Sequence, residues 1–333
     1  MSKYKEFKAQ KIKDYPLDSR PSKVNVDHFA RPLGEDSISA FTDSLPKLLA
    51  ANDLRTLVEK IRKAREKGRA IIWGFGGHVV KVGLAPVLID LMERGFVTAL
   101  ATNGSGMIHD FEIALSGSTS EEVESQLSTG AFGMARETGE FLNQAINKGA
   151  SQGQGIGESV GEFLQQYDTR YPDLSLMLKA HEKDIPLAVL IAMGTDIIHN
   201  HPKASGEAMG KGSQIDFRIF TQQVSLLHGG GVYLNLGSAV ILPEVFLKAV
   251  SLVRNSGKPL KDFTTANLDF IQHYRPTRNV VERPVSGAGT GIALTGHHEI
   301  MVPLLAAMLV EGDRRQETGD RSALRAQKTE NRK

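Results

Sequence analysis

The chain of 333 residues contains no cysteine, which excludes structural disulfides, thiolate zinc sites, iron–sulfur clusters and a cysteine nucleophile. Its longest apolar stretch, Ile300 to Val310, is too short to cross a bilayer. The basic residues at the start have no apolar run behind them, so no secretory signal is predicted. We therefore expect a soluble cytoplasmic protein without a membrane partner, whose chemistry comes from His, Asp, Glu, Lys, Ser or a cofactor.

The distribution of charge and aromatic residues argues against a nucleic-acid partner. The net charge is +2, but residues 1–23 carry +4 and residues 312–333 carry +3, which leaves the body at −5. The chain has one Trp, and no aromatic residues alternate with the basic ones in a binding pattern. An acidic body suits a small amine or another small-molecule substrate better than nucleic acid.

The two ends differ in composition from the body. Residues 312–333 are polar and almost without apolar side chains, so they predict a disordered charged tail. Residues 1–40 predict an extended arm, because prolines there disfavour a helix. Residues 41–311 predict a single domain without a clear linker, and we interpret the glycine-rich stretch 149–163 as a mobile loop within it. The prolines of the arm are Pro16, Pro21 and Pro32.

The body alternates short apolar runs with amphipathic helices. From Asp53 onward, apolar residues recur at helical spacing as far as Gly68, a suitable left-handed cap, and an apolar run follows at once. Buried strands that alternate with helices are typical of a parallel sheet. The sequence thus predicts an α/β fold, a doubly wound, mostly parallel Rossmann-like sheet with helices on both faces. The expected strands are residues 70–75, 97–102, 187–193, 231–236 and 291–296.

Small and polar residues follow the expected strands. Ligands bind at the carboxyl ends of strands in an open parallel sheet, and glycines there let backbone N–H groups approach an anion. One such loop is explained by a tight turn, whereas four on one edge favour a dinucleotide or another large ligand. The first loop departs from the standard fingerprint, because Val79 holds the third glycine position. The predicted cofactor contacts in these loops are Gly74, Gly76, Gly77, Asn103, Gly104, Ser105, Gly237 and Ser238.

Histidines and carboxylates also gather near the expected strand ends. We assign no metal site, because hydrogen-bonded histidines lining a ligand pocket explain the cluster better, but a metal-assisted hydrolase is the alternative. Glu244 and Lys248 stand four residues apart on an expected helix, which indicates an ion pair or, close to the Gly237 loop, a functional carboxylate. The ligand set of the alternative is His199, His201, His297 and Asp196.

Four segments resemble the deoxyhypusine synthase family. The first, IIWGFGGHVVKVGLAPVLIDLMERGFVTALATNGSGMIHDFEIAL, is similar to the family's strand, small-residue loop, helix and strand before T-T-A-G-G-V-E-E-D-L. Next, IPLAVLIAMGTD resembles I-P-V-F-S-P-A-L-T-D, and YLNLGSAVILPEV takes the place of I-L-G-G-G-V-V-K-H-H. Finally, HHEIMVPLLAAML resembles D-A-S-L-V-F-P-L-L. The resemblance covers about residues 50–311.

The resemblance implies one Rossmann-like domain and homotetramers with active sites between paired subunits. It also implies NAD-dependent transfer of the aminobutyl group of spermidine to a lysine of a translation factor. Asn103 stands where a cofactor-contacting Thr lies, and Asp110 and Asp196 match family aspartates. Asp110 therefore joins the expected cofactor contacts.

Three positions depart from the family pattern. His109 replaces a glutamate, Glu244 takes the place of the substrate-site histidine, and His297 replaces an aspartate. We expect His297 to contact the cofactor, and we expect His109, Asp196 and Glu244 to be catalytic. In this scheme His109 or Glu244 is the general base, and Asp196 anchors the amine.

The largest departure is a missing lysine. The family's imine-forming lysine would fall within residues 282–289, which contain none, and a guanidinium cannot form an imine in its place. We therefore expect a deoxyhypusine synthase-like transferase that moves an aminoalkyl group directly between amines with NAD, rather than by ordinary deoxyhypusine synthesis. A non-catalytic ligand-binding protein on this fold is a further alternative.

Overall fold

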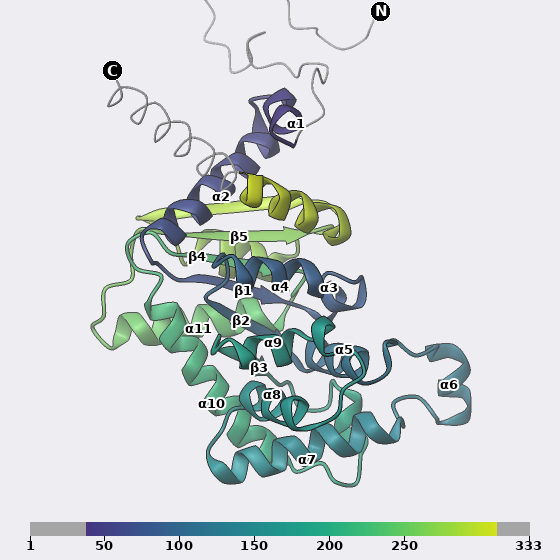
Figure 1. Ribbon diagram of the computed structural model, residues 1–333. Coiled ribbons are helices and arrows are strands. Elements are labelled where there is room, and N and C mark those ends of the chain that lie inside the picture. Colours follow the sequence, from purple (N-terminus) through teal and green to yellow (C-terminus); the bar gives the residue numbers. More distant parts are fainter. Residues whose placement is uncertain (1–37, 312–333) are drawn as a thin grey trace, which may run out of the picture.

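The computed structural model describes residues 38–311 (Figure 1). The expected tail, 312–333, and most of the expected arm, 1–40, lie outside this range. Residues 38–40 of that arm belong to helix α1 (Ile38–Ser44). The described residues are built around one sheet, whereas the limits of the expected domain, 41–311, remain a prediction.

Six parallel strands form the sheet in the order β3-β2-β1-β4-β5-β6. The chain winds outward from β1 to β3, returns to the other side of β1 and winds outward again to β6, so the sheet is doubly wound. At its centre Phe75 of β1 lies opposite Leu236 of β4. The strands are β1 (Ile71–Phe75), β2 (Ala99–Asn103), β3 (Leu187–Leu190), β4 (Val232–Leu236), β5 (Phe263–Asp269) and β6 (Gly289–Thr295).

Helices cover both faces of the sheet. Along β1, Ile71 and Trp73 join the core on one face, and Ile72 between them joins the core on the other, as the two-residue period of a strand requires. The first face is covered by α2 (Leu49–Glu66), α4 (Ala85–Glu93), α5 (Gly104–Ser116), α9 (Leu176–Glu182) and the helix over 298–311. The second face is covered by α10 (Gly206–Ser225) and α11 (Ile241–Asn255).

This architecture confirms the predicted fold class. Helix α2 buries Leu57 and Ile61 on its apolar side, and Gly68 beyond its end has a φ of +59°. That value is favourable for glycine and strained for other residues. Among the described residues, none of the helices has the length and hydrophobicity needed to cross a lipid bilayer.

Strand β5 is absent from the sequence prediction. Its residues, FTTANLD, are all buried, yet three of the seven are Thr or Asn. Hydrogen bonds make this burial acceptable, because Thr265 donates to the carbonyl of Val280 (2.7 Å) and Asn267 donates to Gln272 (2.7 Å). The strand could not be recognised as an apolar run because it carries Thr and Asn side chains, whose polar groups are satisfied by hydrogen bonds within the fold, one of them from Asn235 of β4.

The predicted mobile loop over 149–163 is wrong. The segment is the end of α7 (Arg136–Gln152), a short turn and most of α8 (Ile156–Gln166). Gly153 forms the turn with a φ of +81°, and Gly149 and Gly157 allow close packing against Ser159 and the Leu187 carbonyl. The glycines therefore serve close helix contacts. Before α7 the chain makes an excursion that carries α6 (Val123–Thr129), on the right in Figure 1.

Candidate functional site at the carboxyl edge of the sheet

The centre of the site is the point where the sheet changes winding direction. β1 and β4 lead there into two adjacent turns, and the backbone N–H of Gly76 donates to the carbonyl of Leu236 (2.9 Å). A Cβ atom on Gly76 would stand 2.7 Å from the carbonyl oxygen of Gly237, which itself has a φ of +63°. Ligands of open α/β sheets bind in the crevice at this switch point.

The neighbouring strand end continues the same edge. A side chain on Gly77, which opens helix α3 (Gly77–Lys81), would overlap Ser105 at the start of α5. Similarly, a side chain on Gly104 would overlap the carboxylate of Asp196 beyond β3. The structure thus brings together the loops after β1, β2, β3 and β4, as the sequence predicted from strand ends alone.

Asp196 and His199 form a buried polar pair on this edge. Their side chains are 6% and 5% exposed, and Oδ2 of Asp196 lies 3.8 Å from Nε2 of His199. Neither atom has a hydrogen-bond partner among the described residues. Nδ1 of His199 accepts from the N–H groups of Gly194 (3.0 Å) and Asp196 (3.3 Å), so the neutral ring carries its proton on Nε2.

Leaving Oδ2 of this buried carboxylate without a hydrogen bond has an energetic cost. Burial raises the pKa of Asp196 above its usual value, and His199 and a hydrogen bond from Thr195 oppose that shift. A cationic donor beside Oδ2 would offset the cost of burial, because a charge-assisted hydrogen bond satisfies the carboxylate. Oδ2 of Asp196 therefore suits an ammonium group.

His109 lies on α5 with the Cδ2 edge of its ring toward Gly77, 3.1 Å from where a Cβ on that glycine would stand. Its Nδ1 is 2.7 Å from the hydroxyl oxygen of Thr119. Burial, and secondarily the charge of Lys81, lowers the pKa of His109 below its usual value. A neutral imidazole at pH 7 is suited to accept a proton.

Two aromatic residues beyond the expected set border the Gly237 turn. His298, 1% exposed, would stand 2.7 Å from a Cβ on Gly237, and His78 lies against it with 5.7 Å between ring centroids. His297, the expected cofactor contact, instead stacks on Phe270 and is exposed. Successive side chains at a helix start diverge by about 100°, so adjacency in sequence did not reveal which of the two histidines faces the turn.

Several residues that are expected to contact the cofactor also stabilise the fold through hydrogen bonds, helix capping or close packing. Asp110 accepts hydrogen bonds from Ser175 and from the first N–H groups of α9, and burial raises its pKa to about 6 against those bonds. Asn103 caps α5 by accepting from Gly106 (3.0 Å). Gly74 makes room for Tyr233 beneath the sheet. Their assignment as cofactor contacts stays a prediction.

Ser238 and Glu244 lie beyond β4 at the start of α11. The hydroxyl of Ser238 accepts from the N–H of Leu242 (3.2 Å). Glu244 forms ion pairs with Lys248 on its own helix and with Arg275 (3.3 Å), and Lys248 lowers the pKa of Glu244 below its usual value. The expected intrahelical ion pair is present, and a catalytic role for Glu244 stays a prediction.

The ligand set of the metal-assisted hydrolase is not assembled. His201 accepts from the N–H of Lys203 (3.2 Å) and lies beside Gly139 of α7, and His297 is on the far side of the Gly237 turn beside Phe270. Within residues 38–311, no three His, Asp or Glu side chains gather closely enough to hold a metal ion. The set predicted from strand-end positions is wrong because β3 and β6, whose loops would supply it, are the two outermost strands of the sheet.

The segment that lacks the family's lysine, 282–289, lies at the opposite edge of the sheet. It leads into β6, whose first residue pairs with Phe263, the first residue of β5. Arg283 donates to Asn279 (2.7 Å) and Arg278 forms an ion pair with Glu282, so both guanidinium groups already have partners. Within one chain, this segment does not line the carboxyl edge.

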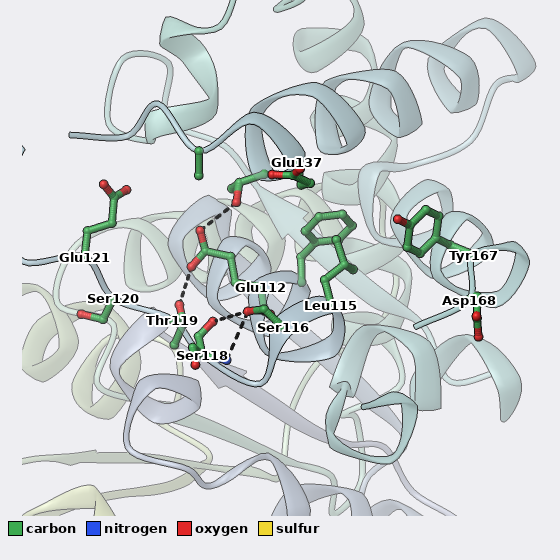
Figure 2. Close-up of a pocket in the computed structure, with 13 residues that line it drawn as sticks. Glu112, Leu115, Ser116, Ser118, Thr119, Ser120, Glu121, Glu137, Tyr167 and Asp168 are labelled. Atoms are coloured by element: carbon green, nitrogen blue, oxygen red, sulfur yellow. Dashed lines mark hydrogen bonds between the residues drawn. The ribbon is translucent and has the colours of Figure 1, made fainter. Parts of the chain in front are cut away.

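A cavity of about 530 Å³ lies next to the site, between α5, α7 and the excursion that carries α6 (Figure 2). Four carboxylates line it, and Lys, Arg and His are absent from its lining. Glu112 on its wall accepts hydrogen bonds from Thr119 (2.5 Å) and Thr138 (2.9 Å). The cavity is thus separated from His109 by these side chains. The carboxylates are Glu112, Glu121, Glu137 and Asp168.

The residues on the carboxyl edge fit an NAD molecule and an amine. Three buried acceptors there have no partner in the described chain: Oδ2 of Asp196, Nδ1 of His298 and Oδ1 of Asn235. Nε2 of His298 lies 3.0 Å from the carbonyl of Leu268, so Nδ1 of the neutral ring is an acceptor. Ribose hydroxyls, a carboxamide and an ammonium group all donate, so they complement this set.

Comparison with known proteins shows that the fold of this chain is similar to that of several solved structures. No model of a known protein family matches the sequence, and no curated protein is matched by it. Unliganded AgrE is similar with a TM-score of 0.51 and 14% identity, over 78% of this chain and 32% of the AgrE chain. The ternary complex of AgrE with ornithine and NAD⁺ has a TM-score of 0.49 and 14% identity over the same shares.

A putative deoxyhypusine synthase from Entamoeba histolytica is also similar, with a TM-score of 0.46 and 12% identity over 90% of this chain and 97% of that one. The chain spans about a third of the length of AgrE. The likeness to AgrE, at 14% identity, is one of fold alone, and it agrees with the Rossmann-like order of the parallel strands.

Proposed function

We propose that this protein binds NAD at the β1–β4 switch point and acts on a small amine held by Asp196. The observation that carries the proposal is the contact between the Gly76 and Gly237 turns, on the same edge of the sheet as Oδ2 of Asp196, which lies beside Gly104 at the end of β2 and has no partner among the described residues. AgrE, a protein of similar fold, has been solved in a complex with ornithine and NAD⁺, which is the same combination of an amine and NAD.

In this proposal some residues on the carboxyl edge of the sheet bind the amine, and another accepts its proton. Oδ2 of Asp196 accepts from the ammonium group, and Nε2 of His199 borders the same space. His109 stands across the Gly77 turn with a lowered pKa, and so can accept the proton that the amine must lose. NAD, when bound, accepts a hydride from the carbon that bears the nitrogen.

The finer proposal is transfer of an aminoalkyl group from one amine to another. Removal of a hydride would leave a C=N bond; the incoming amine would add to its carbon and lose a proton, and the original nitrogen would take up a proton and leave as a free amine. NAD would supply the removal and the return of the hydride. In this scheme no lysine of the protein holds the group, in accord with the absence of lysine from 282–289. Glu244, already paired with Lys248, is the less suitable general base.

We also propose a homotetramer, or at least a dimer. The helix over 298–311 packs most of its apolar side chains into its own subunit, so it offers little for an interface beyond Ile300. Exposed apolar side chains at Phe270, Ile271 and Tyr274 border the edge instead and suit a contact between subunits. A monomer in sedimentation analysis at micromolar concentration would contradict this assembly.

The function is tested with purified full-length protein, NAD and a panel of diamines and polyamines. The proposal predicts transient NAD reduction that depends on the amine, formation of a new amine without net loss of NAD, loss of both in Asp196→Asn, and no borohydride-trapped adduct on the protein. A trapped adduct on a lysine would contradict direct transfer. Binding of NAD without turnover for any amine would favour the non-catalytic alternative.

A further inference from the structure

A chain of hydrogen bonds connects His109 to the wall of the neighbouring cavity. Nδ1 of His109 is 2.7 Å from the hydroxyl oxygen of Thr119, and that hydroxyl donates to Oε2 of Glu112 (2.5 Å). The other carboxylate oxygen, Oε1, accepts from the hydroxyl of Thr138 (2.9 Å). Figure 2 shows Glu112 with the hydrogen bond that it accepts from Thr119.

The direction of each bond follows from the number of protons available. An ionised carboxylate can only accept, so the single proton of Thr119 is committed to Glu112. The oxygen of Thr119 is then an acceptor toward His109, and Nδ1 must be the donor. In the neutral ring this leaves the lone pair on Nε2, the atom next to the Cδ2 that lies near Gly77.

We propose that Glu112 and Thr119 are positioning residues, which hold His109 in its Nδ1–H tautomer and turn an unprotonated Nε2 toward the Gly77 turn. The three residues come from two parts of the chain, His109 and Glu112 from α5 and Thr119 from the segment after it. Thr138 of α7 keeps the carboxylate in place. Hence the packing of α7 against α5 selects the tautomer.

This arrangement reverses the preference of a free ring. Neutral imidazole side chains in water favour the Nε2–H tautomer, which would present a donor to a ligand at the Gly77 turn. With the proton fixed on Nδ1, His109 presents an acceptor there, as a general base requires. The assignment deepens the proposed function, because it gives His109 one proton-accepting atom at that site.

The test is the tautomer of His109, measured by ¹⁵N NMR of the ring nitrogens at pH 8 in the full-length protein without NAD or substrate. We expect the wild type to show a protonated Nδ1 and an unprotonated Nε2. Thr119→Val removes the acceptor at nearly constant volume and should shift the ring toward Nε2–H. Thr119→Ser keeps the hydroxyl and should restore the wild-type pattern.

Two more variants separate the relay from general effects on folding. Thr129→Val makes the same change on α6, where the Thr129 hydroxyl donates only to the carbonyl of Gln126, and should leave His109 unchanged. Glu112→Leu frees the Thr119 proton to turn toward Nδ1 and should weaken the Nδ1–H preference. An Nε2–H tautomer in the wild type, or no change in Thr119→Val, would overturn the proposal.

Because this readout needs neither NAD nor turnover, it separates the two proposals. An Nδ1–H tautomer in a protein that does not bind NAD would support the relay and count against the proposed function. A protein that binds NAD while His109 is the Nε2–H tautomer would support the function and refute the relay.

Discussion

The substitution Gly76→Ala tests the switch point directly. The added Cβ would stand 2.7 Å from the carbonyl oxygen of Gly237 and 3.3 Å from its carbon, where ordinary contacts begin near 3.4 Å. Both partners are backbone, and the turns are tied by the hydrogen bond from Gly76 to Leu236. The two turns must therefore separate by about 0.7 Å, which widens the crevice proposed for NAD.

We expect this overpacking to lower the free energy of unfolding by about 1–3 kcal/mol. At roughly 2–4 °C per kcal/mol, the thermal midpoint should fall by a few degrees up to about ten. Calorimetric titration should show affinity for NAD reduced by about tenfold or more. A matched change, Gly210→Ala inside α10, meets no atom within 4 Å and should raise stability by about 0.5–1 kcal/mol without affecting NAD.

An unchanged thermal midpoint in Gly76→Ala would show that the two turns can move apart without loss of stability. If the variant were destabilised as expected but bound NAD as tightly as the wild type, the turns would not be part of the cofactor site. Either result would refute the reasoning.

Three further predictions concern charged and titrating groups. Burial raises the pKa of Asp216 to about 7 while backbone N–H groups of Val189 and Gly157 oppose the shift, so the folded state binds this proton more tightly than the unfolded chain does. The contribution of Asp216 to the free energy of unfolding is therefore full below about pH 4 and is lost as the pH rises toward 7. When the free energy of unfolding is measured across this range, Asp216→Asn should become more stable relative to the wild type as the pH rises. Lys81→Gln removes a positive charge that lowers the pKa of His109, so NMR titration should give a higher pKa in the variant. Asp196→Asn should weaken amine binding by about tenfold or more in calorimetry, since a hydrogen bond to a charged group contributes about 1.5–3 kcal/mol, while the fold is retained.

The sequence was sufficient for the fold where burial produced a simple pattern. The apolar run that forms β1 and the helical spacing of α2 both match the structure, because these elements are buried on two faces and on one side respectively. β5 escaped recognition because Thr265 and Asn267 interrupt its apolar pattern, and the hydrogen bonds that permit their burial are made with Val280, Gln272 and Asn235 outside the strand. The stretch 149–163 looked like a loop because glycines that permit close helix packing have the same composition as mobile segments.

The site was predictable to the level of the sheet edge. Strand-end positions placed Gly76, Gly104 and Gly237 together, since parallel strands share one carboxyl edge. The sequence does not give side-chain direction: His298, which is not among the expected contacts, faces the Gly237 turn, and the expected contact of His297 with the cofactor stays a prediction. The sequence also could not show that Glu112 acts on His109, because the two side chains are linked only through hydrogen bonds to the hydroxyl of Thr119, which lies in a loop.

Hydrogen–deuterium exchange with and without saturating NAD shows directly whether NAD binds at the β1–β4 switch point. Bound NAD should slow exchange in the segments 74–78, 103–106 and 237–239, and adding an amine should extend protection to 194–199. Protection confined to the cavity segments 116–121 and 135–138, or no protection by NAD at millimolar concentration, would contradict binding of NAD at the switch point.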